Sequence, residues 1–127
     1  MVPVKGSKAS ASEWLRRSRR NLVAAQAMLD RGLPDMAAFH AQQAAEFALK
    51  ALQIHQSARF TRTHNLQTLA GTVAAPPRIV KLAALVTPAY VSARYPDVAG
   101  PRITRRRAEA YMEATRRIVR WARRQMR

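Results

Sequence analysis

Residues 37–54 read AAFHAQQAAEFALKALQI, and this stretch decides the fold. It contains neither glycine nor proline and is rich in alanine and other strong helix formers, so it predicts a helix. Apolar residues recur at three- and four-residue steps on one face, and small alanines form a second apolar face beside it. Because a helix that is apolar around so much of its circumference needs several neighbours, we expect it to be the buried centre of a helical bundle.

Three polar residues of this stretch lie on one strip of the expected helix. Gln43, Glu46 and Lys50 are three and four residues apart, and Glu46 precedes Lys50 in the order that favours an ion pair along a helix. One interpretation is an ordinary ion pair on the helix surface. The other is a polar ledge at the edge of a groove in the bundle, and the sequence leaves both open.

The rest of the chain predicts further helices. The first begins near a serine cap and ends before Gly32, a short one follows the cap Thr63, and the last follows the cap Thr104. Pro88 falls inside a helical pattern, so we expect a kink or a break there. The expected helices cover residues 12–31, 37–54, 64–73, 79–94 and 104–126. No β-alternation appears, and the sequence therefore predicts an all-α bundle.

The length of 127 residues predicts one domain with a core of its own over residues 11–127, preceded by a disordered arm over residues 1–10. Cysteine is absent, which excludes disulfide bonds and thiolate metal sites. The sequence has neither a stretch long enough to span a membrane nor the apolar segment of a signal peptide. We therefore expect a soluble, cytoplasmic protein.

The charge balance is strongly basic, with 23 lysine and arginine residues against 7 aspartate and glutamate residues and a net charge of +16. Such a surface attracts polyanions, and guanidinium groups match phosphate geometry. An acidic protein partner would be attracted by the same positive charge, and an arginine excess also arises from GC-rich coding. Charge alone therefore leaves RNA, nucleotide and acidic protein open as partners.

The histidines do not indicate a metal site. His40, His55 and His64 lie in separate expected segments, without a carboxylate cluster or His-x-x-x-His spacing beside them. His40 falls on the apolar face of the central helix and is interpreted as a core histidine with a hydrogen-bond partner. A glycine-rich phosphate loop and a serine nucleophile elbow are both absent, so we expect no cofactor.

Two short segments concentrate polar residues. In RFTRTHNL (residues 59–66), His64 stands near a helix start beside Arg59 and Arg62, where backbone amides and guanidinium groups favour a phosphate. The alternative is that Thr63 caps the helix, His64 bonds the nearby backbone and both arginines are solvated.

In YVSARYPD (residues 90–97), Tyr90 and Tyr95 flank Arg94 and offer stacking faces and phosphate hydrogen bonds. The alternative is purely structural, with Tyr95 closing the helix end and Arg94 paired to Asp97.

Together these segments resemble the HEPN domain, the helical family named for higher eukaryotes and prokaryotes nucleotide-binding. The resemblance is carried by pieces that follow in the family's order: Trp14-Leu15 and Asn21-Leu22 in the first expected helix, QQAAEFALKAL (residues 42–52), RTHNL (residues 62–66), Tyr90 and ARYPD (residues 93–97). It implies an up-and-down four-helix bundle with one additional short helix, and a homodimer. Many prokaryotic members pair with a small nucleotidyltransferase as a toxin–antitoxin system, so the resemblance also implies that partner.

The toxic members of this family are metal-independent RNases whose motif is an arginine followed, after four to six residues, by a histidine. Arg59 and His64 satisfy that spacing, although the family motif is expected in a later helix. If the chain is an enzyme, His64 would be the general base or acid and Arg59 would stabilise charge on the phosphate. The alternatives are a non-catalytic module that binds nucleotide or phosphate and a subunit that docks the nucleotidyltransferase. The candidate ligand-binding residues are Lys50, Glu46, Arg62, Tyr90, Arg94, Tyr95 and Asp97.

Overall fold

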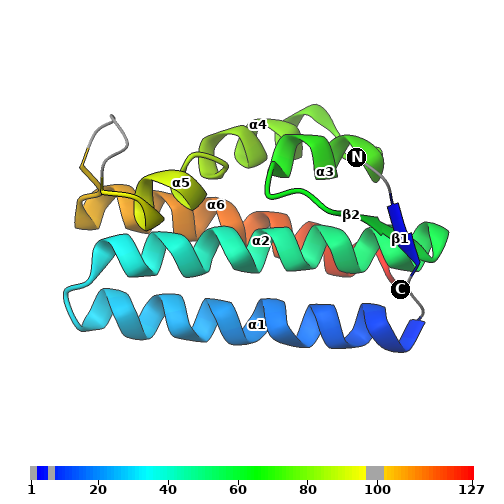
Figure 1. The fold of residues 1–127 in the computed structure, drawn as a ribbon, viewed down its shortest axis with the longest axis horizontal. Coiled ribbons are helices and arrows are strands. Elements are labelled where there is room, and N and C mark those ends of the chain that lie inside the picture. Colours follow the sequence, from blue (N-terminus) through cyan, green and yellow to red (C-terminus); the bar gives the residue numbers. More distant parts are fainter. Residues whose placement is uncertain (1–2, 6–7, 97–101) are drawn as a thin grey trace.

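The computed structural model describes residues 3–5, 8–96 and 102–127. Three long helices lie side by side, and a group of shorter helices covers one side of them (Figure 1). The elements in chain order are β1 (Pro3–Lys5), α1 (Lys8–Asp30), α2 (Pro34–Ser57), β2 (Arg59–Thr61), α3 (Leu66–Thr72), α4 (Pro77–Val86), α5 (Ala89–Arg94) and α6 (Arg105–Gln125). The fold class is all-α, as the sequence predicted, with α4 and α5 together in the place of the fourth long helix.

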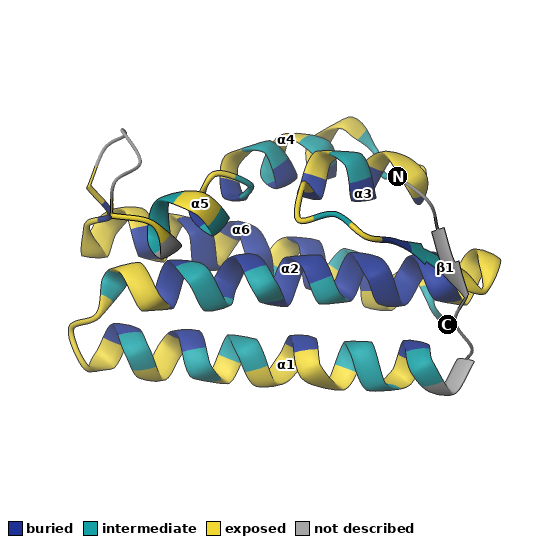
Figure 2. Ribbon diagram, in the orientation of Figure 1, coloured by how far each residue is buried: buried dark blue, intermediate teal, exposed yellow. Residues whose placement is uncertain are grey.

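Helix α2 is the centre of the bundle, as the apolar pattern predicted. Fourteen of its 24 residues are buried, and α1, α3, α5 and α6 all pack against it (Figure 2). Half of the buried positions are alanines, which allow neighbouring helices to approach closely. Two hydroxyl groups bond its backbone: Ser18 Oγ on α1 donates to the carbonyl of Ala44 at 2.6 Å, and Thr115 Oγ1 on α6 donates to that of Ala41 at 3.0 Å.

The helix boundaries mostly follow the predicted signals. Thr104 caps α6 by accepting a hydrogen bond from the backbone of Arg107, and the chain breaks between α4 and α5 at Pro88, both as expected. The short helix differs from the prediction. Asn65 caps it by accepting from the Thr68 amide at 3.0 Å, whereas Thr63 only accepts from the Asn65 amide. Because the Asn65 side chain reaches a free amide in the first turn of α3, the helix starts at Leu66 and His64 lies outside it.

A two-stranded ribbon was absent from the prediction. β1 pairs antiparallel with β2, Val4 opposite Phe60, so the segment expected to be a disordered arm carries a strand and the first residues of α1. Strands of three residues are too short to show an alternating pattern, and the pairing joins segments more than fifty residues apart. The Gln53 amide of α2 holds the ribbon by donating to Thr61 Oγ1 and accepting from the Thr61 amide, both at 2.9 Å.

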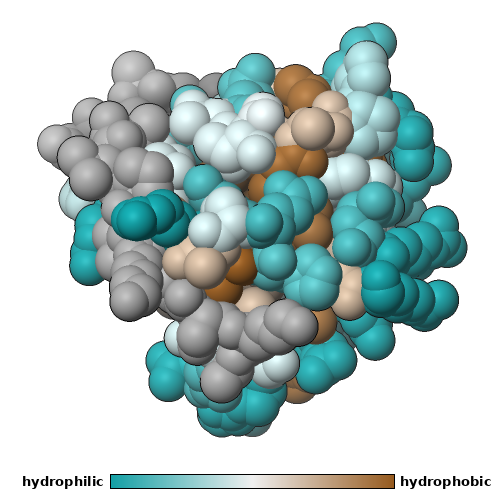
Figure 3. All heavy atoms as spheres, turned by 90° about the vertical axis from the view of Figure 1, so that its right-hand side faces the viewer, coloured by the Kyte–Doolittle hydropathy of each residue, from teal (hydrophilic) through white to brown (hydrophobic). Residues whose placement is uncertain are grey.

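The described surface offers no segment for a membrane span. Among the helices that the structure describes, none is both long enough and apolar enough to cross a bilayer. Seen from the end that carries β1 and the C-terminus, the described surface is mostly hydrophilic, and apolar residues appear only as a narrow strip (Figure 3).

Candidate functional site

A buried carboxylate is the centre of the candidate site. Glu46 on α2 is 2% exposed, and it accepts a hydrogen bond from Lys50 Nζ at 3.0 Å on Oε2 and from His64 Nδ1 at 2.8 Å on Oε1. The amides of Gln42 and Gln43 add longer bonds to Oε1, at 3.3 and 3.4 Å. A carboxylate buried to this degree requires such partners, because an unpaired charge away from water is costly. We call Glu46, Lys50, His64 and Tyr90 the His64 cluster.

The helical period of α2 brings Glu46 and Lys50 together. They are four residues apart on one face, and their side chains are only 2% and 6% exposed. The interpretation as an ordinary surface ion pair is therefore wrong. The ammonium group also lies over two aromatic rings, 5.6 Å from the centroid of Trp14 on α1 and 5.7 Å from that of Phe60 on β2. These rings close the site on the side of the ribbon and give the cation a second source of electrostatic stabilisation.

His64 enters from the extended connection between β2 and α3. The amide of Gln42 donates to its backbone carbonyl at 3.0 Å, so α2 holds both the main chain and the ring of this residue. A carboxylate only accepts hydrogen bonds, and the proton of the ring therefore sits on Nδ1. The side chain is 52% exposed, and the opposite ring nitrogen, Nε2, has no partner among the described contacts. A histidine oriented by a carboxylate in this way is a standard acid–base arrangement.

Tyr90 on α5 joins the second predicted segment to the first. Its ring is stacked on His64, with centroids 4.0 Å apart and planes 13° apart. His64 and Tyr90 are 26 positions apart in sequence, and the stack brings their two segments to one face of the bundle. The centroid of the tyrosine ring also lies 6.2 Å from that of Phe39 on α2. The imidazole is thus fixed by a hydrogen bond on its edge and by an aromatic ring on its face.

The other predicted residues lie around this cluster. Arg62 is exposed, and its guanidinium carbon lies 5.9 Å from the centroid of Phe60, the ring that also contacts Lys50. Arg59 is exposed on β2, and no described contact joins its side chain to His64. Tyr95 lies at the end of α5 and is 46% exposed. Two predictions fall outside the described structure, namely Asp97 and the side chain of Arg94.

Sequence reasoning missed the supporting residues. Gln42 is fully buried and bonds both Glu46 and the His64 backbone, while Trp14 and Phe60 cover Lys50. The signal for Gln42 was its place in an otherwise apolar part of the central helix, where a buried amide needs partners. No local signal existed for Phe60, because its role depends on the ribbon.

Burial and hydrogen bonding shift the pKa values of His40 and Glu13. His40 hydrogen-bonds Asn21 Oδ1 at 2.9 Å through Nδ1, so it has the expected partner, but it is only partly buried and lies outside the buried core; burial lowers its pKa. Hydrogen bonds from Arg16 and Arg17 lower the pKa of Glu13 to about 2. Within the described part of the chain, no group of three His, Asp or Glu side chains could hold a metal ion.

The fold and the site together define a class of protein: a small, basic helical bundle in which a buried carboxylate holds an exposed histidine. A family model described as the HEPN domain matches residues 11–125. The chain therefore belongs to the HEPN domain family, as its sequence motifs predicted.

Solved structures agree with this assignment. The protein TT1696 of Thermus thermophilus is 33% identical with a TM-score of 0.82, over 91% of this chain and 97% of that one. ST0689, an archaeal HEPN homologue, is 29% identical with a TM-score of 0.78, over 92% of this chain and 98% of that one. A HEPN domain protein of Thermotoga maritima, tm0613, shares the fold at 20% identity, with a TM-score of 0.72 over 87% of this chain and 94% of that one. A search of curated protein sequences gave no match.

Proposed function

We propose that this HEPN protein binds RNA at the His64 cluster and cleaves it without a metal ion, as one component of a toxin–antitoxin pair with a small nucleotidyltransferase. The observation that carries the proposal is the 2.8 Å bond between Glu46 and Nδ1 of the half-exposed His64. That bond fixes the tautomer and leaves Nε2 to accept a proton from a ligand. The net charge of +16 supports a polyanionic ligand.

The chemistry follows from the free ring nitrogen. Nε2 takes the proton of a ribose 2′-hydroxyl, and the 2′-oxygen attacks the adjacent phosphorus. The bond from phosphorus to the 5′-oxygen breaks, and that oxygen takes a proton from water or from a second histidine. In a homodimer, His64 of the other copy would be a natural source of that proton. Arg59 on β2 and Arg62 directly after β2 are both exposed and supply positive charge for the phosphate.

A non-catalytic role is the second candidate. Among the described contacts no arginine reaches His64, and Lys50 is occupied by Glu46 and two aromatic rings. Such a site would bind a nucleotide by stacking on the exposed parts of the His64 and Tyr90 rings and by charge attraction, without bond cleavage. The same protein would then act in the pair as a binding subunit for the nucleotidyltransferase.

Cleavage of RNA in EDTA decides between these roles. We expect wild type to cleave, and His64→Ala to lose activity by about 10²–10⁴-fold, which is the usual contribution of a general base or acid. His55→Ala is the matched control, because His55 is exposed at the end of α2 and no described contact joins it to the cluster. Equal activity in wild type and His64→Ala would remove His64 from catalysis. Binding of RNA without cleavage would support the second candidate.

The partner and the dimer are tested separately. A small nucleotidyltransferase encoded beside this protein should co-purify with it at low salt, and its co-expression should relieve growth inhibition. Analytical ultracentrifugation at micromolar concentration should give twice the monomer mass of 14.2 kDa. A monomer at that concentration would contradict the site shared between two copies.

A further inference from the structure

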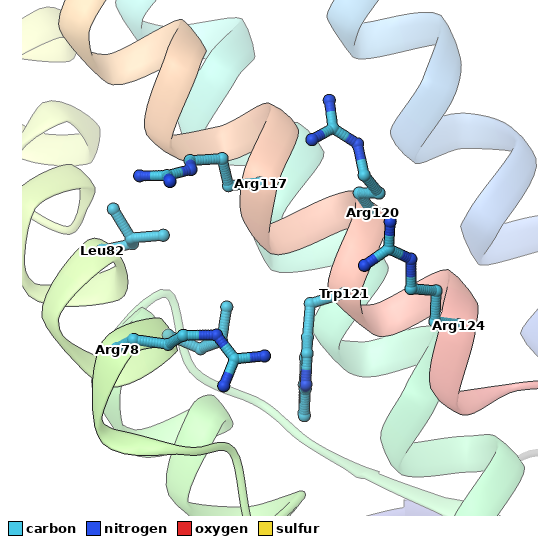
Figure 4. A pocket seen from close by; sticks show the side chains of 7 residues that line it. Arg78, Leu82, Arg117, Arg120, Trp121 and Arg124 are labelled. Carbon is cyan, nitrogen blue, oxygen red and sulfur yellow. The ribbon is translucent and has the colours of Figure 1, made fainter.

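A second basic region lies away from the His64 cluster, in a groove between α4 and α6. It has a volume of about 270 Å³ and shares no residue with the cluster. Its side chains come from the first turns of α4 and from the C-terminal half of α6 (Figure 4). We call it the arginine groove, and its lining residues are Arg78, Ile79, Leu82, Arg117, Arg120, Trp121 and Arg124.

The helical period of α6 builds one wall of the groove. Arg117, Arg120, Trp121 and Arg124 follow the i, i+3, i+4, i+7 spacing and so share one face of the helix. The first and last of these residues are about 10.5 Å apart along the axis, at 1.5 Å per residue. Arg78 extends from α4 toward Trp121, and Arg117 extends from α6 toward α4 (Figure 4). The cationic groups therefore approach from both sides.

The charge of the groove is not compensated. None of its lining residues is acidic, and within the described structure none of the four guanidinium groups makes a hydrogen bond or an ion pair. Four like charges on one groove repel one another, so the folded protein gains free energy when an anion binds there. This distinguishes the groove from Arg16 and Arg17 on α1, which both bond Glu13.

Trp121 indicates which class of anion fits the groove. Its indole is partly buried and lines the groove together with the apolar side chains of Ile79 and Leu82 and the four arginines. A flat aromatic surface that shares a groove with guanidinium groups suits a nucleotide, because the base stacks on the ring and the phosphates bind the arginines. An acidic peptide would use the charges but would gain nothing specific from the indole.

We propose that the arginine groove binds single-stranded RNA, with a base against Trp121 and backbone phosphates on Arg78, Arg117, Arg120 and Arg124. The inference rests on the proposed function in taking RNA as the ligand, but it holds whether or not His64 cleaves that RNA. The groove then anchors the substrate strand, while the His64 cluster receives another part of it.

The test uses an RNA that cannot be cleaved. A fluorescein-labelled oligouridine of twelve nucleotides with 2′-O-methyl groups lacks the attacking hydroxyl, so binding is measured apart from any reaction. The protein carries Trp14→Phe, which makes Trp121 its only tryptophan. We expect the unlabelled oligonucleotide to quench the fluorescence of Trp121, and His64→Ala to leave this quenching unchanged. An unchanged emission at saturation would overturn the proposal.

Substitution of the four groove arginines by glutamine gives the second readout. Anisotropy of the labelled RNA should show a salt dependence reduced by about 3 in slope, since each phosphate contact on a single strand contributes about 0.7. The matched control replaces four other exposed arginines that lie outside the groove, namely Arg19, Arg31, Arg106 and Arg123. If the control reduces affinity and slope as much as the groove variant does, the binding reflects only net charge and the proposal fails.

The aromatic contribution is measured by Trp121→Ala against Trp121→Phe. We expect the alanine variant to bind the RNA about tenfold more weakly and the phenylalanine variant to stay close to wild type, because base stacking needs only an aromatic face. Circular dichroism melts confirm that both variants fold. Equal affinities of the two variants, or quenching of Trp121 by polyglutamate but not by the RNA, would overturn the assignment to RNA.

Discussion

The His64 cluster and the arginine groove are both basic regions, but only the cluster contains its own counter-charge. In the cluster, Glu46 is buried and bonded to Lys50 and His64. In the groove, the four arginines are exposed and no carboxylate lines the space. The cluster is therefore assembled by the fold itself, whereas the groove is held open by the helices against the repulsion of its own charges.

This difference teaches how each region responds to a ligand. The cluster has fixed ring and carboxylate positions before anything binds, which is what acid–base chemistry requires. The positive charges of the groove are neutralised only when an anion binds, so binding there should depend strongly on salt concentration. Four substitution series test this contrast, and we give them from the largest expected effect to the smallest.

Removal of the buried carboxylate should have the largest effect. Glu46→Ala leaves Lys50, with a side chain 6% exposed, without its partner, and we expect the free energy of unfolding to fall by about 3–5 kcal/mol. Urea unfolding monitored by circular dichroism gives this value. The double variant Glu46→Gln, Lys50→Met should recover most of the loss, because it removes both charges. A loss below about 1 kcal/mol in Glu46→Ala would mean that water reaches Lys50 and that the cluster is not buried.

The support of the ribbon should have an intermediate effect. Gln53→Ala removes both bonds to Thr61 and leaves the buried Thr61 amide without an acceptor, which should cost about 1–3 kcal/mol. Exchange of the Thr61 amide hydrogen should speed up in the variant, as measured by NMR. Gln56→Ala, an exposed site near the end of the same helix, is the control. An unchanged exchange rate at Thr61 would show that Gln53 does not hold the ribbon to α2.

Substitutions in the arginine groove should raise the free energy of unfolding, whereas the two changes above lower it. Replacing Arg78, Arg117, Arg120 and Arg124 by glutamine removes mutual repulsion, so we expect the protein to become more stable, by about 1 kcal/mol at low ionic strength. The gain should disappear at about 1 M salt, where the charges are screened. Thermal melts at both salt concentrations measure it. A loss of stability at low salt would show that the guanidinium groups have partners within the fold.

The smallest effect concerns a histidine without a carboxylate. Burial lowers the pKa of His40, which hydrogen-bonds the neutral Asn21, so at acidic pH the unfolded chain binds more protons than the folded one. Its contribution to stability is complete above the unfolded pKa of about 6.5 and is lost as the pH falls through the folded value. His40→Gln should therefore flatten the fall in unfolding free energy below about pH 6.5, with His55→Gln as the control. A plot of unfolding free energy against pH that runs parallel to that of wild type would contradict the lowered pKa of His40.

The sequence predicted those parts of the fold that depend on local signals. The centre of the bundle, the cap at Thr104 and the break at Pro88 each follow from residues within a few positions. The ribbon does not, since it pairs segments far apart and each strand is only three residues long. The start of α3 was misplaced because Thr63 and Asn65 are both good caps, and only the structure shows which side chain reaches a free amide.

The candidate site divides in the same way. The Glu46–Lys50 pair follows from helical spacing, whereas its burial under Trp14 and Phe60 depends on tertiary packing. The stacking of His64 on Tyr90 joins two segments that were predicted separately. The groove was not predicted at all: the arginines of α6 were visible, but nothing local places Arg78 of α4 opposite them.

The hydroxyl groups of Ser18 and Thr115 have a consequence for the precision of the assembly. An alanine-lined helix presents a smooth surface, so α1 and α6 would meet little steric resistance if they slid a short way along α2. Each hydroxyl is bonded to one carbonyl, of Ala44 and of Ala41, and a slide would break that bond inside the core. These two bonds therefore fix the positions of α1 and α6 along the axis of α2. Since Arg117 and Trp121 follow Thr115 on α6, the Thr115 bond also fixes their position along the helix axis relative to Arg78.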